Sequence, residues 1–188
     1  IAQGRTNIGG AQLFVTVRGT LTSTLPPVIV LPTGPMLGHE YLFEPTEFLL
    51  GPGGVENPSR LLVYLDPRAT GRSSFGALGD ADVTVEAHVR DVIGLVEHID
   101  ELLEEPREVD FLGHGYGAAL AVLYAAEHPE RVRRLVLSNP FPANVEDYAR
   151  WLENAQARLT SSEIDRLVEL TQFRVCLRDL DLCSQEQW

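Results

Sequence analysis

The sequence predicts an α/β fold, in which a mainly parallel β-sheet is flanked by helices. Short apolar runs alternate along the chain with stretches whose apolar residues recur every three or four positions. A glycine-rich turn joins one of these runs to an apolar helix. Such alternation requires right-handed crossovers between parallel strands, and 188 residues are enough for one domain with a sizeable core.

Five segments have the character of strands. The first alternates apolar and polar side chains, as a half-buried strand does. The others are short apolar runs, and two of them are typical of strands that are buried on both faces. The five strands are expected at residues 12–18, 27–31, 60–65, 109–112 and 134–138.

Two helices are expected between these strands. Apolar residues at steps of three and four predict an amphipathic helix over about residues 86–103, and an almost wholly apolar helix follows at residues 118–126. The polar face of the first helix carries Glu86, Arg90, Asp91, Glu97 and Asp100. After Pro142 no strand follows, and residues 145–177 have the pattern of two or more amphipathic helices.

The most informative residues form a tight turn between the strand at 109–112 and the helix at 118–126. Residues 113–117 read Gly-His-Gly-Tyr-Gly, the arrangement of a nucleophile elbow, G-x-S-x-G, with glycine at its centre. Gly113 and Gly117 supply the small flanking residues that such a turn needs. A phosphate loop is the alternative, but neither the G-x-G-x-x-G nor the Walker spacing is satisfied.

Three segments carry a family resemblance. Residues 113–140 resemble the α/β-hydrolase proteins related to prolyl aminopeptidases (proline iminopeptidases), which read G-H-S-x-G-G, a small apolar helix, H-P-E-R-V and L-V-L. Residues 31–42 look like the family's L-H-G-G-P-G-x-G-H-x-Y-L, and residues 66–73 look like its D-x-R-G-x-G-x-S. The resemblance implies an N-terminal, incomplete part of an α/β-hydrolase core over residues 1–142 and the beginning of a helical cap over residues 143–188.

The departures from the family pattern fall on its catalytic site. Gly115 stands where the family has the nucleophilic serine, so the nucleophile position is vacant. Pro32-Thr33 replaces the His-Gly opening of the oxyanion loop, and Met36 replaces its last glycine.

The resemblance also implies where the oxyanion hole lies. Backbone N–H groups near Gly34 and at Tyr116 would form it. Because these are backbone groups, the hole could persist without a serine side chain.

The acid and the histidine of a triad are expected after the nucleophile in chain order. After Gly115 the sequence contains only His128, at the far end of the following helix, roughly 18 Å away by helical rise. His114 flanks the vacant position and is expected to pack and hydrogen-bond rather than to act as a base. Asp66 and Arg68 are expected to tie down their loop.

No metal ion and no cofactor are expected. The five histidines are scattered, and no pair shows ligand spacing with a plausible third partner. Cys176 and Cys183 are too few for a disulfide framework, and the absence of lysine excludes a Schiff-base lysine mechanism. An acidic cluster near the end of the first helix is expected to be a solvated face; it comprises Glu97, Asp100, Glu101, Glu104 and Glu105.

The formal net charge of −12 argues against nucleic acid and anionic membrane surfaces as partners. No apolar run approaches the roughly 18 residues that a transmembrane helix needs. A soluble protein is therefore expected, and the scarcity of cysteine fits a cytoplasmic location.

Two classes of function fit these residues. In the first, the chain is a degenerate relative of the hydrolases that binds a small molecule or peptide in the cleft under the cap, or a protein. In the second, the full-length wild-type protein is an active serine aminopeptidase or hydrolase, seen here as a truncated Ser-to-Gly variant. In either case the chain is expected to be incomplete as a catalytic domain. The remainder is then absent from the given sequence, is supplied as a second segment or chain, or has been lost by decay of the gene. The strand at 134–138 is then expected to leave an apolar edge exposed.

Overall fold

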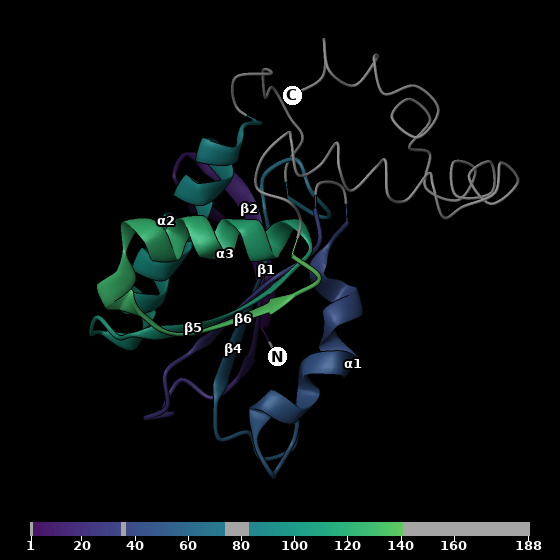
Figure 1. Ribbon diagram of the computed structural model, residues 1–188. Coiled ribbons are helices and arrows are strands. Elements are labelled where there is room, and N and C mark those ends of the chain that lie inside the picture. Colours follow the sequence, from purple (N-terminus) through teal and green to yellow (C-terminus); the bar gives the residue numbers. More distant parts are fainter. Residues whose placement is uncertain (1, 35–36, 74–82, 141–188) are drawn as a thin grey trace, which may run out of the picture. The chain divides into compact units, whose positions relative to one another are not determined.

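The structure, a computed structural model, describes residues 2–34, 37–73 and 83–140 (Figure 1). The chain divides into two units, Ile1–Phe141 and Pro142–Trp188. The second unit lies outside the described residues, so the helical cap expected from residue 143 stays a prediction.

Six strands form one mixed sheet in the order β1-β2-β4-β3-β5-β6. Their bounds are Ala2–Ile8 (β1), Ala11–Gly19 (β2), Val28–Leu31 (β3), Leu61–Asp66 (β4), Val109–His114 (β5) and Val132–Ser138 (β6). Strands β1, β2 and β4 pair antiparallel, whereas β4, β3, β5 and β6 pair parallel. All five expected strands are present, and the α/β fold with a mostly parallel sheet is confirmed.

Strand β1 is not foreseen by the apolar pattern, because its side chains are mostly exposed and do not alternate in polarity. It pairs with β2 through the turn Gly9-Gly10, with Ile8 opposite Ala11. Both turn glycines have positive φ, 56° and 83°, as two-residue hairpin turns require. A Gly-Gly dipeptide in front of an alternating strand is the signal that indicates such a hairpin.

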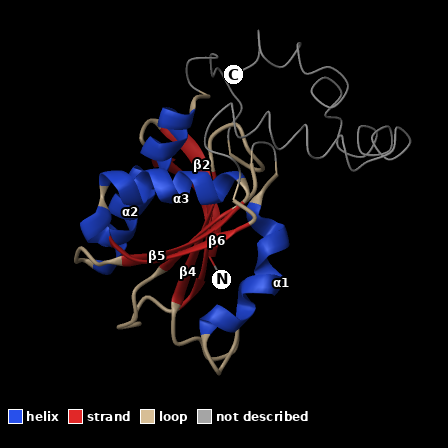
Figure 2. Cartoon of the chain, in the orientation of Figure 1, coloured by secondary structure: helices blue, strands red, loops and turns tan. Residues whose placement is uncertain are grey.

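Helices α2 (Val85–Leu103) and α3 (Tyr116–Glu127) pack on one face of the sheet (Figure 2). Both were expected from the sequence. Helix α2 begins after Thr84, whose side-chain oxygen accepts the Ala87 N–H at 3.2 Å, an N-cap interaction.

The opposite face is covered by short helices that follow β3. They are η1 (His39–Leu42), α1 (Phe43–Thr46) and η2 (Glu47–Leu50). A further turn, η4 (Pro129–Arg131), connects α3 to β6. Segments of three or four residues are too short to show a helical period, so the sequence pattern did not predict them.

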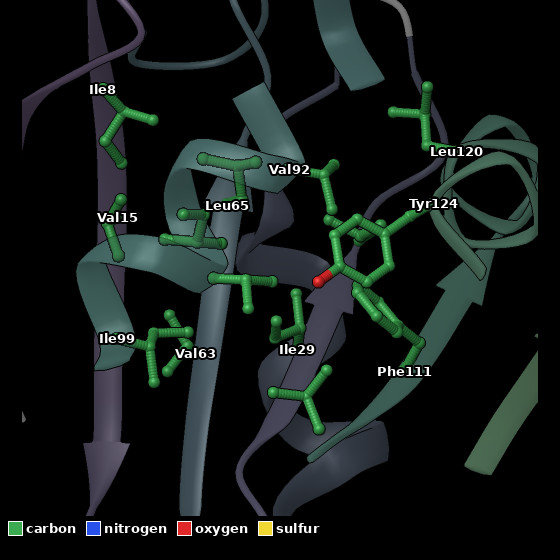
Figure 3. Packing of buried hydrophobic residues seen from close by; sticks show 14 of the residues in the cluster. Ile8, Val15, Ile29, Val63, Leu65, Val92, Ile99, Phe111, Leu120 and Tyr124 are labelled. Atoms are coloured by element: carbon green, nitrogen blue, oxygen red, sulfur yellow. The ribbon is translucent and has the colours of Figure 1, made fainter. Parts of the chain in front are cut away.

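Strands β3 and β4 are buried on both faces, as their continuous apolar runs predict. Successive side chains point to opposite faces and therefore enter two different hydrophobic clusters. The cluster beneath α2 and α3 contains Ile29, Val63 and Phe111 (Figure 3). The cluster beneath the short helices contains Val30 and Tyr64. The central strands are thus held from both sides.

Strand β6 is at the edge of the sheet within the described part of the chain. Leu135, Val136 and Leu137 are 36%, 53% and 39% exposed. The apolar edge expected for this strand is therefore present among the described residues.

The expectation that the acidic cluster on α2 is a solvated face is wrong for Asp100. Its carboxylate accepts hydrogen bonds from the Arg131 guanidinium at 2.9 and 2.7 Å and from the Arg107 N–H at 3.2 Å. Asp100 therefore joins the end of α2 to the segments that precede β5 and β6, whereas Glu101 and Glu104 are exposed.

Truncation of Leu120 tests the contribution of α3 to the core. The Leu120 side chain is fully buried, so Leu120→Ala should lower the free energy of unfolding by about 2–5 kcal/mol, through lost burial and the cavity left behind. Val122 lies on the same helix but is 40% exposed, and Val122→Ala should change stability by no more than about 0.5 kcal/mol. Urea unfolding of both variants measures the difference, and equal effects would contradict this packing.

Candidate functional site

A single residue separates β5 from α3. Strand β5 ends at His114 and α3 begins at Tyr116, with Gly115 between them. The backbone of Gly115 has φ 56° and ψ −117°, a region that residues with a side chain populate sparsely. Its N–H donates to the carbonyl oxygen of Ser138 at 2.9 Å, which holds the turn against the end of β6. We call residues 113–117 the elbow turn.

The glycines that flank the elbow turn are required by close approach. A Cβ atom on Gly113 would lie 2.5 Å from the Ala118 Cα, and one on Gly117 would lie 2.5 Å from the Leu31 carbonyl oxygen. Real Cβ contacts are never this short, so neither position tolerates a side chain. The Gly117 N–H also donates to the Pro32 carbonyl oxygen at 3.0 Å. The start of α3 is therefore packed tightly against the end of β3.

The two residues predicted for the oxyanion hole lie side by side. A Cβ atom added to Gly34 would be 3.1 Å from Cδ1 of Tyr116. Tyr116 is the first residue of α3, where backbone N–H groups have no acceptor within the helix. The structure thus brings Gly34 and Tyr116 together beside Gly115, and their role as oxyanion donors stays a prediction.

His88 of α2 holds the Tyr116 ring in place through a hydrogen bond to its hydroxyl. The Tyr116 hydroxyl lies 2.7 Å from His88 Nδ1, and His88 Nε2 lies 3.1 Å from the Arg68 carbonyl oxygen. A carbonyl can only accept, so His88 carries its proton on Nε2, and Nδ1 accepts from the tyrosine. Burial lowers the pKa of His88 and raises the pKa of Tyr116, so both groups are neutral in the folded protein.

A second polar chain holds the loop that follows β3. The Thr33 N–H donates to the Tyr41 hydroxyl at 2.7 Å, and that hydroxyl is hydrogen-bonded to His114 Nδ1 at 2.8 Å. Burial raises the pKa of Tyr41, which keeps the hydroxyl protonated and able to donate. His114 is thus a packing and hydrogen-bonding residue, as expected from the sequence.

The Thr33 side chain lies where a side chain of residue 115 would project. A Cβ atom built on Gly115 would overlap the Thr33 hydroxyl oxygen and lie 2.8 Å from the Thr33 Cβ. The space beside the elbow turn is therefore filled from the opposite loop.

The buried carboxylate of Asp66 joins the loops that follow β3 and β4. It accepts the His39 N–H at 2.8 Å and the Arg72 N–H at 2.9 Å, and its Oδ1 also lies 2.7 Å from His39 Nδ1. The Ser73 hydroxyl donates to the Asp66 carbonyl oxygen. The expectation that Asp66 ties down its loop is confirmed.

Arg68 anchors the same loop to α2. Its Nε donates to Asp91 Oδ2 at 2.9 Å, and its Nη2 donates to Asp91 Oδ1 at 2.6 Å. The assignment of Asp91 to the polar face of α2 is wrong, since Asp91 is fully buried. An ion pair with a residue distant in sequence compensates the cost of burying this carboxylate, and helical periodicity cannot reveal such a partner.

Within the described part of the chain, His114 is the histidine next to Gly115, and the other histidines serve elsewhere. His128 follows the twelve residues of α3, roughly 18 Å of helical rise from Gly115, and packs on Tyr124 with ring centroids 5.0 Å apart. His39 is fully buried beside Asp66.

No described group of three or more histidine, cysteine or acidic side chains could hold a metal ion. Nor is any described helix long and apolar enough to cross a membrane.

Two contacts of this site could not be read from the sequence. Tyr41 belongs to the segment that resembles the family, but nothing local indicates that its hydroxyl bridges Thr33 and His114. His88 lies in an ordinary helical pattern, and only the packing of α2 against the elbow turn brings it to Tyr116.

The mostly parallel sheet, the helices on both of its faces and the tight turn from β5 into α3 define an α/β hydrolase. The sequence profile described as "Serine aminopeptidase, S33" matches residues 59–181, which is more than half of the chain. The chain belongs to this serine aminopeptidase family.

Similar solved structures include relatives of proline iminopeptidase. The proline iminopeptidase-related protein of Thermus thermophilus is 27% identical, with a TM-score of 0.67 over 83% of this chain and 50% of that one. Proline iminopeptidase of Mycobacterium smegmatis is 17% identical, with a TM-score of 0.65 over 97% of this chain and 59% of that one, and supports the fold alone.

One sequence relative is named for a different activity. Coelenterazine h 2-monooxygenase of Renilla reniformis is 31% identical over 77 residues, which are 40% of this chain and 25% of that protein. The chain spans about half the length of the solved structures it matches and a quarter of this monooxygenase.

Ala69 offers a test of backbone strain in the loop after β4. It has φ 55°, and the family pattern D-x-R-G-x-G-x-S has glycine at this position. Ala69→Gly should raise the free energy of unfolding by about 1 kcal/mol, because a left-handed conformation is costly for alanine. The same substitution at the exposed helical Ala126 should lower it by about 0.5–1 kcal/mol. Thermal or urea unfolding should show opposite signs, and a destabilising Ala69→Gly would contradict the strain.

His88 should make stability depend on pH near neutrality. Because burial lowers its pKa in the folded state, the unfolded chain binds the proton more readily below the unperturbed value. The free energy of unfolding should therefore fall as pH decreases through about 6.5, by at most about 1.4 kcal/mol per pH unit. His88→Gln should flatten this dependence in unfolding measurements between about pH 7.5 and 5.5, above the range of most carboxylates. An unchanged slope in the variant would refute the assignment.

Proposed function

We propose that the chain is a non-hydrolytic relative of the prolyl aminopeptidases that binds a small molecule or peptide beside a degenerate nucleophile elbow. The observation that carries the proposal is Gly115, which has the position and strained backbone of a nucleophile but no side chain. Acyl transfer by this family's chemistry requires a hydroxyl at that position and a base that removes its proton. Gly115 has no hydroxyl, and the adjacent histidine, His114, is hydrogen-bonded to Tyr41.

Backbone groups support the binding role. The N–H of Tyr116 and the backbone at Gly34 do not depend on a serine, and dipoles at the start of α3 favour a partly negative oxygen there. A carbonyl or carboxylate of a peptide or small acid is the ligand chemistry that suits such donors. We propose that this ligand lies in the cleft expected beneath the cap. The remainder of the domain is supplied by a further segment or chain, and the protein is cytoplasmic.

An active hydrolase is the second candidate. Membership of the serine aminopeptidase family and the 27% identity to a proline iminopeptidase-related protein favour it. In that case Gly115 replaces a natural serine. Against this, a serine side chain would collide with Thr33, so a single Ser-to-Gly change does not account for the site.

Hydrolysis assays separate the two candidates. The chain and its Gly115→Ser variant should turn over an activated ester and a prolyl amide no faster than buffer. The adjacent histidine, His114, is hydrogen-bonded to Tyr41, and no described acid and histidine complete a triad with position 115. A fluorophosphonate probe, read by intact mass, should leave both proteins unmodified. Turnover of the prolyl amide, or an adduct mapped to Thr33, would overturn the proposal.

Ligand binding is tested in the same protein. Calorimetric titration with short proline-containing peptides and small carboxylates should give saturable binding. Gly34→Val should abolish that binding, because its side chain would press on the Tyr116 ring that lies 3.1 Å from a Cβ at this position. Gly4→Val is the matched control, since Gly4 lies in strand β1 without a positive φ and a Cβ there meets no atom within 4 Å. Equal binding by both variants would refute the location.

A further inference from the structure

We infer that positions 33 and 115 have exchanged their side chains across the elbow turn, so that Thr33 fills the nucleophile's place and Gly115 is the residue this arrangement requires. The inference deepens the proposed function, because it explains why the elbow lacks a side chain. In this inference, the missing side chain at position 115 goes together with the presence of Thr33.

The first support is steric. A Cβ atom on Gly115 would overlap the Thr33 hydroxyl oxygen, and it would still lie 2.8 Å from the Thr33 Cβ and 3.4 Å from its Cα. Rotation about the Thr33 side chain moves the hydroxyl but leaves the Cβ where it is. Any residue with a side chain at position 115 therefore requires the Thr33 backbone to move.

The second support is that the Thr33 backbone is held in place. Its N–H donates to the Tyr41 hydroxyl, which is in turn hydrogen-bonded to His114, the residue before Gly115. Directly before it, the Pro32 carbonyl accepts the Gly117 N–H at 3.0 Å. The Tyr41–His114 and Gly117–Pro32 hydrogen bonds join the loop to the elbow turn itself, so moving Thr33 away would break contacts on either side of Gly115.

The third support lies in the sequence. The family pattern L-H-G-G-P-G has glycine at position 33, and G-H-S-x-G-G has serine at position 115. This chain has threonine and glycine at these two positions, so one hydroxyl and one glycine remain, with their places reversed. Because the two positions touch, the reversal preserves the packing of the site while it moves the hydroxyl onto the loop after β3.

The exchange alters what the site offers to a ligand. The Thr33 hydroxyl makes no hydrogen bond with the described residues, whereas its backbone N–H is already bound to Tyr41. In the proposed function, Thr33 is the residue that closes the elbow to an attacking hydroxyl from position 115.

A double-mutant cycle on thermal unfolding tests the exchange. Gly115→Ala should lower the unfolding midpoint on the order of 5 °C or more beyond the effect of Gly9→Ala, since overpacking adds to the backbone cost. Gly9 is the matched control because it has the same φ of 56° and no atom within 4 Å of its Cβ position. In the Thr33→Gly background, at least half of the excess loss at position 115 should disappear.

Thr33→Ala separates the effect of the Thr33 hydroxyl from that of its Cβ atom. It removes the hydroxyl but keeps the Cβ, so it should rescue Gly115→Ala less than Thr33→Gly does. If Gly115→Ala alone does not fold, the double variant with Thr33→Gly should fold, and an equally unfolded double variant overturns the inference. Additive midpoint shifts overturn it as well, whatever the hydrolysis assays show. Turnover of the prolyl amide together with strong coupling would instead refute the proposed function and leave the exchange standing.

Discussion

The close approach of helix α3 to the ends of β3 and β5 is the constraint on which the site depends. The first turn of α3 lies so near these strands that Gly113 and Gly117 have no room for a Cβ atom. With both ends of the turn fixed in this way, Gly115 must adopt its positive φ to connect strand to helix. The large clusters on the two faces of β3 and β4 keep the strands in place, so the turn cannot relax by moving the sheet.

Buried polar groups place the surrounding loops relative to this turn. Asp66 binds backbone N–H groups of the loops after β3 and β4, and Arg68 pairs with Asp91 of α2. Burying a carboxylate is costly unless it is hydrogen-bonded or paired with a cation. These contacts therefore constrain the positions of the loops that supply the partners. Consequently the segment that carries Thr33 and Tyr41 is fixed against the elbow turn, and His88 is fixed beneath Tyr116.

Family membership and the state of the site are different conclusions with different supports. The profile match and the sheet topology assign the chain to the serine aminopeptidase family. The chemistry proposed for it follows from positions 33 and 115. The Thr33 hydroxyl on the loop after β3 does not occupy the turn at which the family's nucleophile stands, and Gly115 carries no side chain there. In the proposed function, the fold and its backbone donors are kept while the group that attacks a substrate is lost.

The sequence by itself determined the strand and helix order, the tight glycine turn and the vacancy at Gly115, because apolar periodicity and the demand for glycine are local properties. It did not reveal β1, whose exposed residues carry no pattern, or the burial of Asp91. Only the tertiary structure decided that Thr33 fills the space beside Gly115 and that His88 supports Tyr116. These contacts join residues far apart in the chain, and their existence depends on how β3, α2 and α3 pack rather than on any neighbouring residue.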